Sequence, residues 1–218
     1  MLKRDALKYD LKAALQTVEL PSTKEQILRA ATTLFAQKGM NGTTTRDIAG
    51  LAGVNIAALH YHWGDKEELL QAVYQNVIDK TLELTEQLLR QPVFGVQRSV
   101  TKYLGKIFDF FIEHPEYPRI LLFGNLEEPP FLEEMRRRFM TPLIQRVSGW
   151  LTVLIGADKV RTIDPEIFLF NTYGMLLTPF ADLGCQQEVL GEKVPDPAVA
   201  RRFKEQFIDS VLTILGLD

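Results

Sequence analysis

The chain has 218 residues, 46% of them hydrophobic, and a formal net charge of −3 at pH 7. This length fits one large or two small domains, and no apolar run reaches the roughly 18 residues that a membrane helix needs. The single cysteine, Cys185, excludes an intrachain disulfide and a thiolate metal cluster, and it fits a reducing cytoplasm. Residues 1–66 carry nine Lys and Arg against six Asp and Glu, whereas the remainder is acidic. A nucleic-acid partner is therefore expected near the N-terminus.

Residues 1–21 are predicted to be an N-terminal extension. Leu7, Leu11 and Leu15 recur at helical spacing among basic residues, and Pro21 ends the segment. Charges every few residues exclude a secretion signal. We expect an extra helix packed on the protein or a frayed end, with a basic arm that follows DNA as the alternative.

Residues 22–66 are predicted to form a helix-turn-helix domain of three helices. A capping box of Ser22 and Glu25 opens the first helix, which should run to about Gln37 before Gly39. Thr44 is the expected N-cap of the second helix, and Gly53 supplies the turn after it. A third helix, 56–62, then follows. In such a layout the last helix reads the DNA major groove.

The outward face of the 56–62 helix is suited to DNA. No acidic residue lies between Asp47 and Asp65, so this surface would not repel phosphate. The outward side chains are small or can form hydrogen bonds, which lets them approach base edges; they are Asn55, Ile56, Ala57, Ala58, His60 and Tyr61. The pattern favours DNA binding over an ordinary helical hairpin.

The run from Lys24 to Val73 resembles the N-terminal domain of the Tet-repressor (TetR) family of bacterial transcriptional regulators. Shared features are the Ile27/Ala30/Ala31/Leu34/Phe35 stripe, Thr44-Thr45, Ala52-Gly53-Val54, Tyr61-His62 and Lys66-Glu67-Glu68-Leu69. The chain departs from the family at Asn55, Ala57, His60 and Trp63, where Ser or Thr, Gly, Tyr and Phe are frequent. The operator sequence therefore cannot be read by analogy.

The resemblance implies a set of contacts with a double-stranded DNA operator. Thr45 and Arg46 would contact phosphate, and Tyr61 and Lys66 would hold the DNA backbone. The residues expected to face bases are Asn55, Ile56, Ala57 and His60, with the Asn able to pair with adenine.

Residues 67–218 are predicted to be a second, helical domain, which makes the chain all-α with about nine helices. The expected helices are 66–90, 93–113, 116–127, 130–155, 165–183 and 197–215, with a loop at 184–196. Pro142 and Pro179 should kink or end two of them. The resemblance implies that this domain binds an effector and forms a homodimer through 165–183 and 197–215.

Aromatic and methionine residues of this second domain could line an apolar cavity, although ordinary core is the alternative for each. The candidates are Phe108, Phe111, Phe123, Met135, Phe139, Trp150, Phe168 and Tyr173. An apolar or aromatic small molecule is the expected effector. Arg136-Arg137-Arg138 is interpreted as a solvated helix face.

Catalytic and metal-binding patterns are missing from the sequence, so no catalytic residue, cofactor or metal is predicted. His60 and His62 lie two positions apart on a helix and make a poor metal pair. The prediction is a ligand-released, homodimeric, cytoplasmic transcriptional repressor without a membrane partner. Two alternatives remain: a small-molecule-binding helical dimer without DNA activity, and an all-α enzyme.

Overall fold

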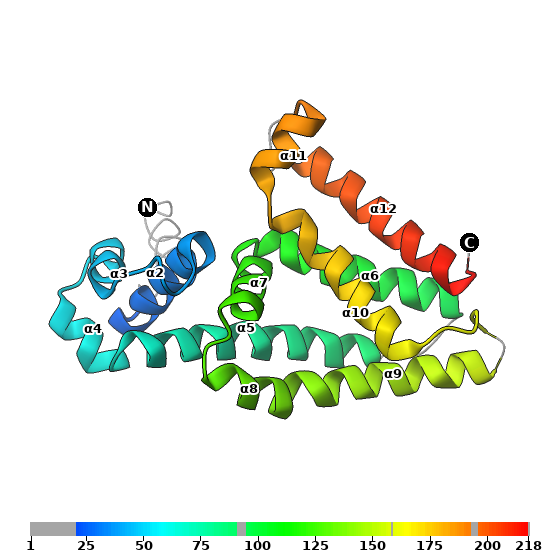
Figure 1. Ribbon diagram of the computed structural model, residues 1–218, viewed down its shortest axis with the longest axis horizontal. Helices are drawn as coiled ribbons and strands as arrows, with labels where there is room; N and C mark the ends of the chain where they lie inside the picture. The colour runs from blue at the N-terminus through cyan, green and yellow to red at the C-terminus, as the bar shows by residue number, and fades with distance from the viewer. Residues whose placement is uncertain (1–20, 91–94, 158, 193–195, 218) are drawn as a thin grey trace, which may run out of the picture.

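A computed structural model describes residues 21–90, 95–157, 159–192 and 196–217. Throughout these ranges the regular structure is helical and no strand occurs, which confirms the all-α prediction. The helix expected within residues 1–20 lies outside the described residues. Figure 1 shows one set of helices at one end, a larger set at the other, and one long helix joining them.

The smaller set consists of α2 (Thr23–Lys38), α3 (Thr45–Ala52) and α4 (Ile56–Trp63), together called the N-terminal group. The predicted capping box of Ser22 and Glu25 is present at the start of α2. Ile27, Ile48 and Leu59 come from the three different helices and are fully buried in a shared core. Apolar residues at helical spacing therefore hold α3 and α4 against α2.

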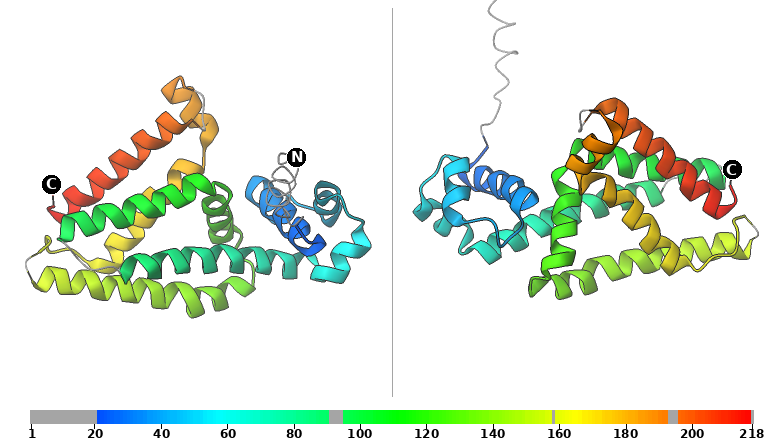
Figure 2. Two further views of the ribbon diagram at one scale, coloured as in Figure 1. Left: turned by 180° about the vertical axis from the view of Figure 1, so that it is seen from behind. Right: turned by 45° about the horizontal axis from the view of Figure 1, so that its top comes forward.

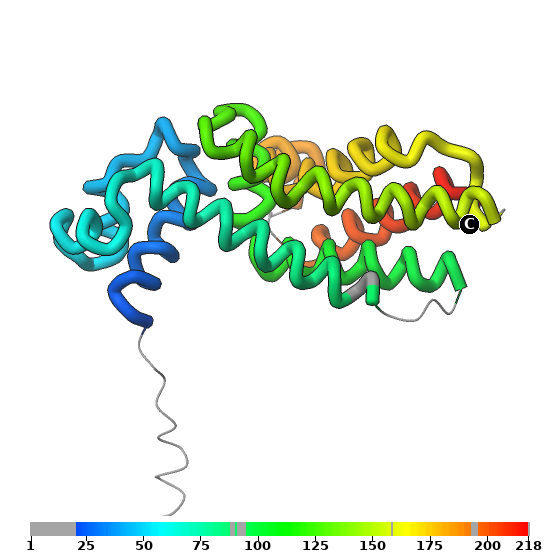
Figure 3. Tube along the Cα trace, turned by 90° about the horizontal axis from the view of Figure 1, so that it is seen from below, coloured from blue at the N-terminus to red at the C-terminus, as the bar shows by residue number. Residues whose placement is uncertain are grey.

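The joining helix is α5 (Lys66–Leu89), which begins directly after α4. Its first half buries Leu69, Val73 and Val77. Figure 3 shows α5 from below as one continuous rod that leaves the N-terminal group and passes along the rest of the protein.

The remaining helices, called the body, are α6 (Val96–Glu113), α7 (Glu116–Glu127), α8 (Phe131–Met135), the π-helical turn η1 (Arg136–Met140), α9 (Thr141–Gly156), α10 (Pro165–Leu177), the 3₁₀ turn η2 (Thr178–Phe180), α11 (Leu183–Leu190) and α12 (Pro197–Leu215). In Figures 1 and 2, α12 lies beside α6, and α10 crosses between α9 and α12. None of the described helices combines the length and apolar character needed to cross a bilayer.

Three expected segments differ from the structure. The segment 184–196, expected to be a loop, instead contains most of α11, because Asp182 accepts a 2.9 Å hydrogen bond from the Cys185 backbone N–H and caps a helix that Gly191 ends. The helix expected over 130–155 is divided by the π-helical turn η1, which directly precedes Pro142 at the start of α9. The helix expected over 165–183 ends at Leu177, and Pro179 lies in η2.

Candidate functional site

The turn that precedes α3 is fixed by a reciprocal cap. The Asp47 backbone N–H donates to the Thr44 hydroxyl oxygen (3.1 Å), and the Asp47 carboxylate accepts from the Thr44 hydroxyl (2.7 Å) and backbone N–H (3.1 Å). The hydroxyl hydrogen bond, followed by the backbone one, lowers the pKa of Asp47. Gly53 ends α3 in the left-handed region (φ 69°), which a side chain would disfavour. The predicted cap and turn are both confirmed.

Helix α4 lies at the end of the N-terminal group, away from the body (Figure 1). Leu59 is fully buried beneath it and anchors the helix, whereas Tyr61 is 85% exposed and Ile56 is 39% exposed. Asn55, Ala57 and His60 are also exposed, so the structure brings the predicted reading residues together on one accessible helix. The Tyr61 ring meets the neighbouring His62 ring edge to face, with the ring centres 5.1 Å apart. Exposed aromatic and aliphatic side chains that gather on one helix are typical of a binding surface.

The first turn of α3 holds the other two predicted contacts near α4. Arg46 is exposed and Thr45 is half-buried. Both lie at the positive end of the α3 dipole, where backbone N–H groups favour an anion such as phosphate.

The chain is similar to known bacterial regulators. The family model described as bacterial regulatory proteins, tetR family, matches residues 27–73. The HTH-type transcriptional repressor NicS of Pseudomonas putida is 26% identical over 166 residues, which cover 76% of this chain and 77% of NicS. The HTH-type transcriptional regulator RutR of Escherichia coli is 26% identical over 193 residues, which cover 88% of each chain. The chain carries a TetR-family DNA-binding domain at residues 27–73, and over most of its length it is similar to bacterial transcriptional regulators.

Solved structures share the fold of this chain. The ketosteroid transcriptional regulator KstR2 of Mycobacterium tuberculosis aligns with a TM-score of 0.69 at 18% sequence identity, covering 90% of this chain and 96% of that one. This likeness concerns the fold. The relatives found by sequence are named as transcriptional regulators and not as enzymes, in agreement with the prediction of a non-enzymatic protein.

Two of the predicted DNA contacts, Asn55 and His60, also bind backbone atoms of this protein. Asn55 Oδ1 accepts a 2.7 Å hydrogen bond from the Ala58 N–H as the α4 N-cap, so a bidentate pair with adenine would compete with the cap. His60 Nδ1 lies 2.6 Å from the Gly64 carbonyl oxygen. These contacts hold the Asn55 and His60 side chains in place near the two ends of α4, which limits the DNA bases that each can contact.

Lys66 has a structural role that the sequence did not predict. Its ammonium donates to the carbonyl oxygens of Met40 (2.9 Å) and Thr43 (3.1 Å), which lie in the turn between α2 and α3. An ammonium has three donors, so these bonds and a phosphate contact are compatible. The interpretation of Lys66 as a contact to DNA alone is therefore incomplete.

Trp63 makes a further contact within the N-terminal group, with Lys24. Its indole N–H donates to the Lys24 carbonyl oxygen (3.1 Å), and the Lys24 ammonium lies 4.6 Å from the centre of the Trp63 ring. The pair ties the end of α4 to the start of α2 through a hydrogen bond and a cation–π contact.

Side chains of α7 connect the N-terminal group to the body through contacts that the sequence did not predict. The Arg119 guanidinium donates to the Ala36 carbonyl oxygen of α2 (2.7 Å) and to the Phe180 carbonyl oxygen of η2 (3.3 Å). Glu127 accepts from the backbone N–H of Met40 (2.9 Å). A lone arginine in an otherwise apolar run, YPRILLF, was the available signal for a buried polar contact.

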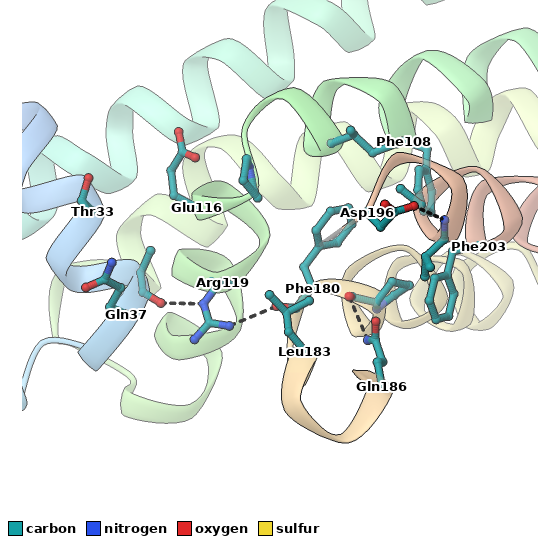
Figure 4. A pocket seen from close by; sticks show the side chains of 16 residues that line it. Thr33, Gln37, Phe108, Glu116, Arg119, Phe180, Leu183, Gln186, Asp196 and Phe203 are labelled. Atoms are coloured by element: carbon teal, nitrogen blue, oxygen red, sulfur yellow. Dashed lines mark hydrogen bonds between the residues drawn. The ribbon is translucent and has the colours of Figure 1, made fainter. Parts of the chain in front are cut away.

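A pocket of about 480 Å³ lies beside Arg119, between α2, α6, α7, α11 and α12 (Figure 4). Among the eight predicted pocket residues, Phe108 lines it and the other seven do not. Phe111, Met135 and Phe168 are buried core residues, and Phe139, Trp150 and Tyr173 are half-buried and pack against that core. Phe123 instead approaches Gly39 at the end of α2. The pocket wall includes α2, which the sequence did not place near an effector.

Proposed function

We propose that this TetR-family regulator binds a palindromic DNA operator as a homodimer, represses transcription in the cytoplasm, and is released from DNA by a small-molecule effector. The observation that carries the proposal is the exposed face of α4, on which Tyr61 and Ile56 project without an acidic neighbour. An α-helix with such a face fits the major groove. The family relatives are themselves named as helix-turn-helix repressors or regulators.

The proposed DNA contacts fall into those to the phosphate backbone and those to the bases. Thr45 and Arg46 would neutralise phosphate at the start of α3, while Ile56 and Ala57 would meet thymine methyl groups in the groove. Tyr61 and Lys66 would hold the DNA backbone, and Lys66 would do so from the turn that it also stabilises.

Dimerisation through α10 and α12 is supported by the surface of α10. Phe168 of this helix is buried in the body, yet Ile167 is 60% and Phe170 is 62% exposed. A helix that is apolar on more than one side needs a second partner to cover it. A second copy of the chain, related by a twofold axis, would provide that cover and match a palindromic operator.

Selection of bound duplexes from a random DNA pool tests the proposal. We expect an inverted-repeat site to be enriched. Tyr61→Ala should weaken binding to that site with little loss of stability, because the side chain is almost fully exposed. Leu126→Ala is the matched control, since Leu126 is 81% exposed on α7 and distant from α4. Enrichment of no site, even at low salt, would favour a ligand-binding dimer without DNA activity.

Sedimentation equilibrium tests the dimer separately. Phe170→Glu places a charge on the exposed face of α10 and should convert a dimer to a monomer, whereas Leu126→Glu should not. If both variants sediment like the unchanged protein, α10 does not form the interface.

A further inference from the structure

The pocket beside Arg119 is built from both parts of the molecule. Thr33, Ala36 and Gln37 of α2 form one wall, while Phe108 of α6 and Phe203 of α12 belong to the opposite side (Figure 4). A molecule in this pocket would therefore contact the N-terminal group and the body at the same time.

The walls on the body side are aromatic and well packed. Phe108 is 1% exposed, and its ring centre lies 5.8 Å from that of Phe180 and 5.7 Å from that of Phe207. Ile112 at the rim is 36% exposed, so apolar surface remains open to solvent. The volume of about 480 Å³ lies within the range of roughly 300–1,000 Å³ that is usual for small-molecule sites.

The polar side chains of the walls are already bonded within the protein. Arg119 is the single cation among the described lining residues, and its Nε and Nη1 atoms donate to backbone carbonyls. Asp196 accepts from the Ala198 N–H (2.8 Å) as the cap of α12, and Gln186 donates to the Pro179 carbonyl (2.9 Å). An anionic guest would meet two carboxylates, Glu116 and Asp196, beside this single cation. The pocket thus favours an uncharged guest.

We infer that this pocket binds an uncharged, mainly apolar small molecule with a ring that packs against Phe180 and Phe203, and that a bound molecule holds α2 in one position against the body. The binding site stands on its own geometry. Its effect on DNA rests on the proposed function, because α3 and α4 are packed on α2 and would be held with it. A ligand that contacts both parts shifts the equilibrium between their arrangements only as far as it binds one arrangement more tightly.

The binding test uses N-phenyl-1-naphthylamine, an uncharged apolar fluorophore that brightens when it leaves water. Ala200 lines the pocket, so Ala200→Phe should fill it, whereas Ala198 is exposed two positions away on the same helix and does not line it. We expect Ala200→Phe to weaken probe binding by about tenfold or more and Ala198→Phe to leave it unchanged. Equal affinity in both variants would overturn the site.

Hydrogen exchange on the unmodified full chain gives a second test that does not depend on how the variants fold. Bound probe should protect amides at residues 33–38 of α2 and 199–203 of α12, with no change in α9. Protection of α12 without α2 would show that the guest does not hold the N-terminal group. Protection confined to α9 would place the probe elsewhere. Either result would overturn the inference.

The effect on DNA is measured with the selected operator duplex, with and without the probe. Probe should change operator affinity by about tenfold in the unmodified chain and in Ala198→Phe but not in Ala200→Phe. An unchanged affinity at saturating probe would overturn the regulatory part. If no duplex is ever selected, the proposed function fails, while the fluorescence and exchange experiments still decide the site and its hold on α2.

Discussion

The carboxylate of Glu127, at the last turn of α7, accepts a 2.9 Å hydrogen bond from the backbone N–H of Met40, 87 positions earlier in the chain. Arg119, eight positions before Glu127 on the same helix, donates to the Ala36 carbonyl oxygen at 2.7 Å. Residues eight apart differ by about 80° around a helix, so both can lie within one broad stripe. Helix α7 therefore binds the end of α2 through two charged side chains. The Glu127 carboxylate accepts from a backbone N–H, and the Arg119 guanidinium donates to a backbone carbonyl.

Glu127→Ala should lower the free energy of unfolding by about 1–3 kcal/mol, because it leaves the part-buried Met40 N–H without its charged acceptor. Urea unfolding is the measurement. Glu128→Ala is the control, since its carboxylate makes only an exposed 3.7 Å ion pair with Arg136. Equal losses in the two variants would show that the contact with Met40 contributes nothing.

Gly124→Ala should destabilise the protein by about 1–3 kcal/mol, because a Cβ at this position would overlap the Tyr74 ring and hydroxyl. Tyr74 cannot easily move away, since it is buried and its hydroxyl donates to the Ile120 carbonyl oxygen (2.5 Å). Gly149→Ala, in the middle of α9 with no atom near its Cβ position, should instead stabilise by about 0.5–1 kcal/mol. Thermal unfolding of both variants tests the contrast, and a stable Gly124→Ala would contradict it.

Lys66→Ala and Arg46→Ala should differ in a way that separates DNA contact from turn stabilisation. Both should reduce the salt dependence of operator binding by about one unit of slope, since each would neutralise one phosphate. Only Lys66→Ala should also lower thermal stability, because its ammonium holds the Met40 and Thr43 carbonyls. A salt slope that is unchanged in Lys66→Ala would leave Lys66 with its structural role alone.

Asp47→Asn should destabilise the protein at pH 7, and the difference from the unmodified chain should shrink in acid. Hydrogen bonds from Thr44 lower the Asp47 pKa in the folded state. A carboxyl group whose pKa is lower in the folded state stabilises the folded protein at pH values above its unfolded pKa of about 3.9. This stabilisation is lost as the pH falls through the pKa of the folded state. Thr44→Val removes the hydroxyl that is the largest cause and should abolish most of this pH dependence. The measurement is the urea midpoint of each protein from pH 7 to pH 2. A difference between Asp47→Asn and the unmodified chain that stays constant over this range would contradict the role given to the Asp47 carboxylate.

Local features were predictable because their partners lie a few residues apart. The capping box of Ser22 and Glu25 spans three positions, as does the pair of Thr44 and Asp47, so each could be read from the sequence and is present. Helix α11 was missed although Asp182 and Gly191 mark its ends, because its short run LGCQQEVL has only a weak apolar stripe.

The sequence by itself determined the helices of the N-terminal group, their caps and the exposed face of α4, since helical spacing decides which side chains point outward once Leu59 points in. Only the tertiary structure decided that Arg119 meets Ala36 across 83 positions and that α2 forms a wall of a pocket with α12. Such contacts depend on how helices cross, and several crossings can bury the same apolar stripes equally well. For that reason the sequence could not tell which of the candidate aromatic residues pack in the core and which line a pocket. Among the eight candidates, only Phe108 lines the pocket beside Arg119.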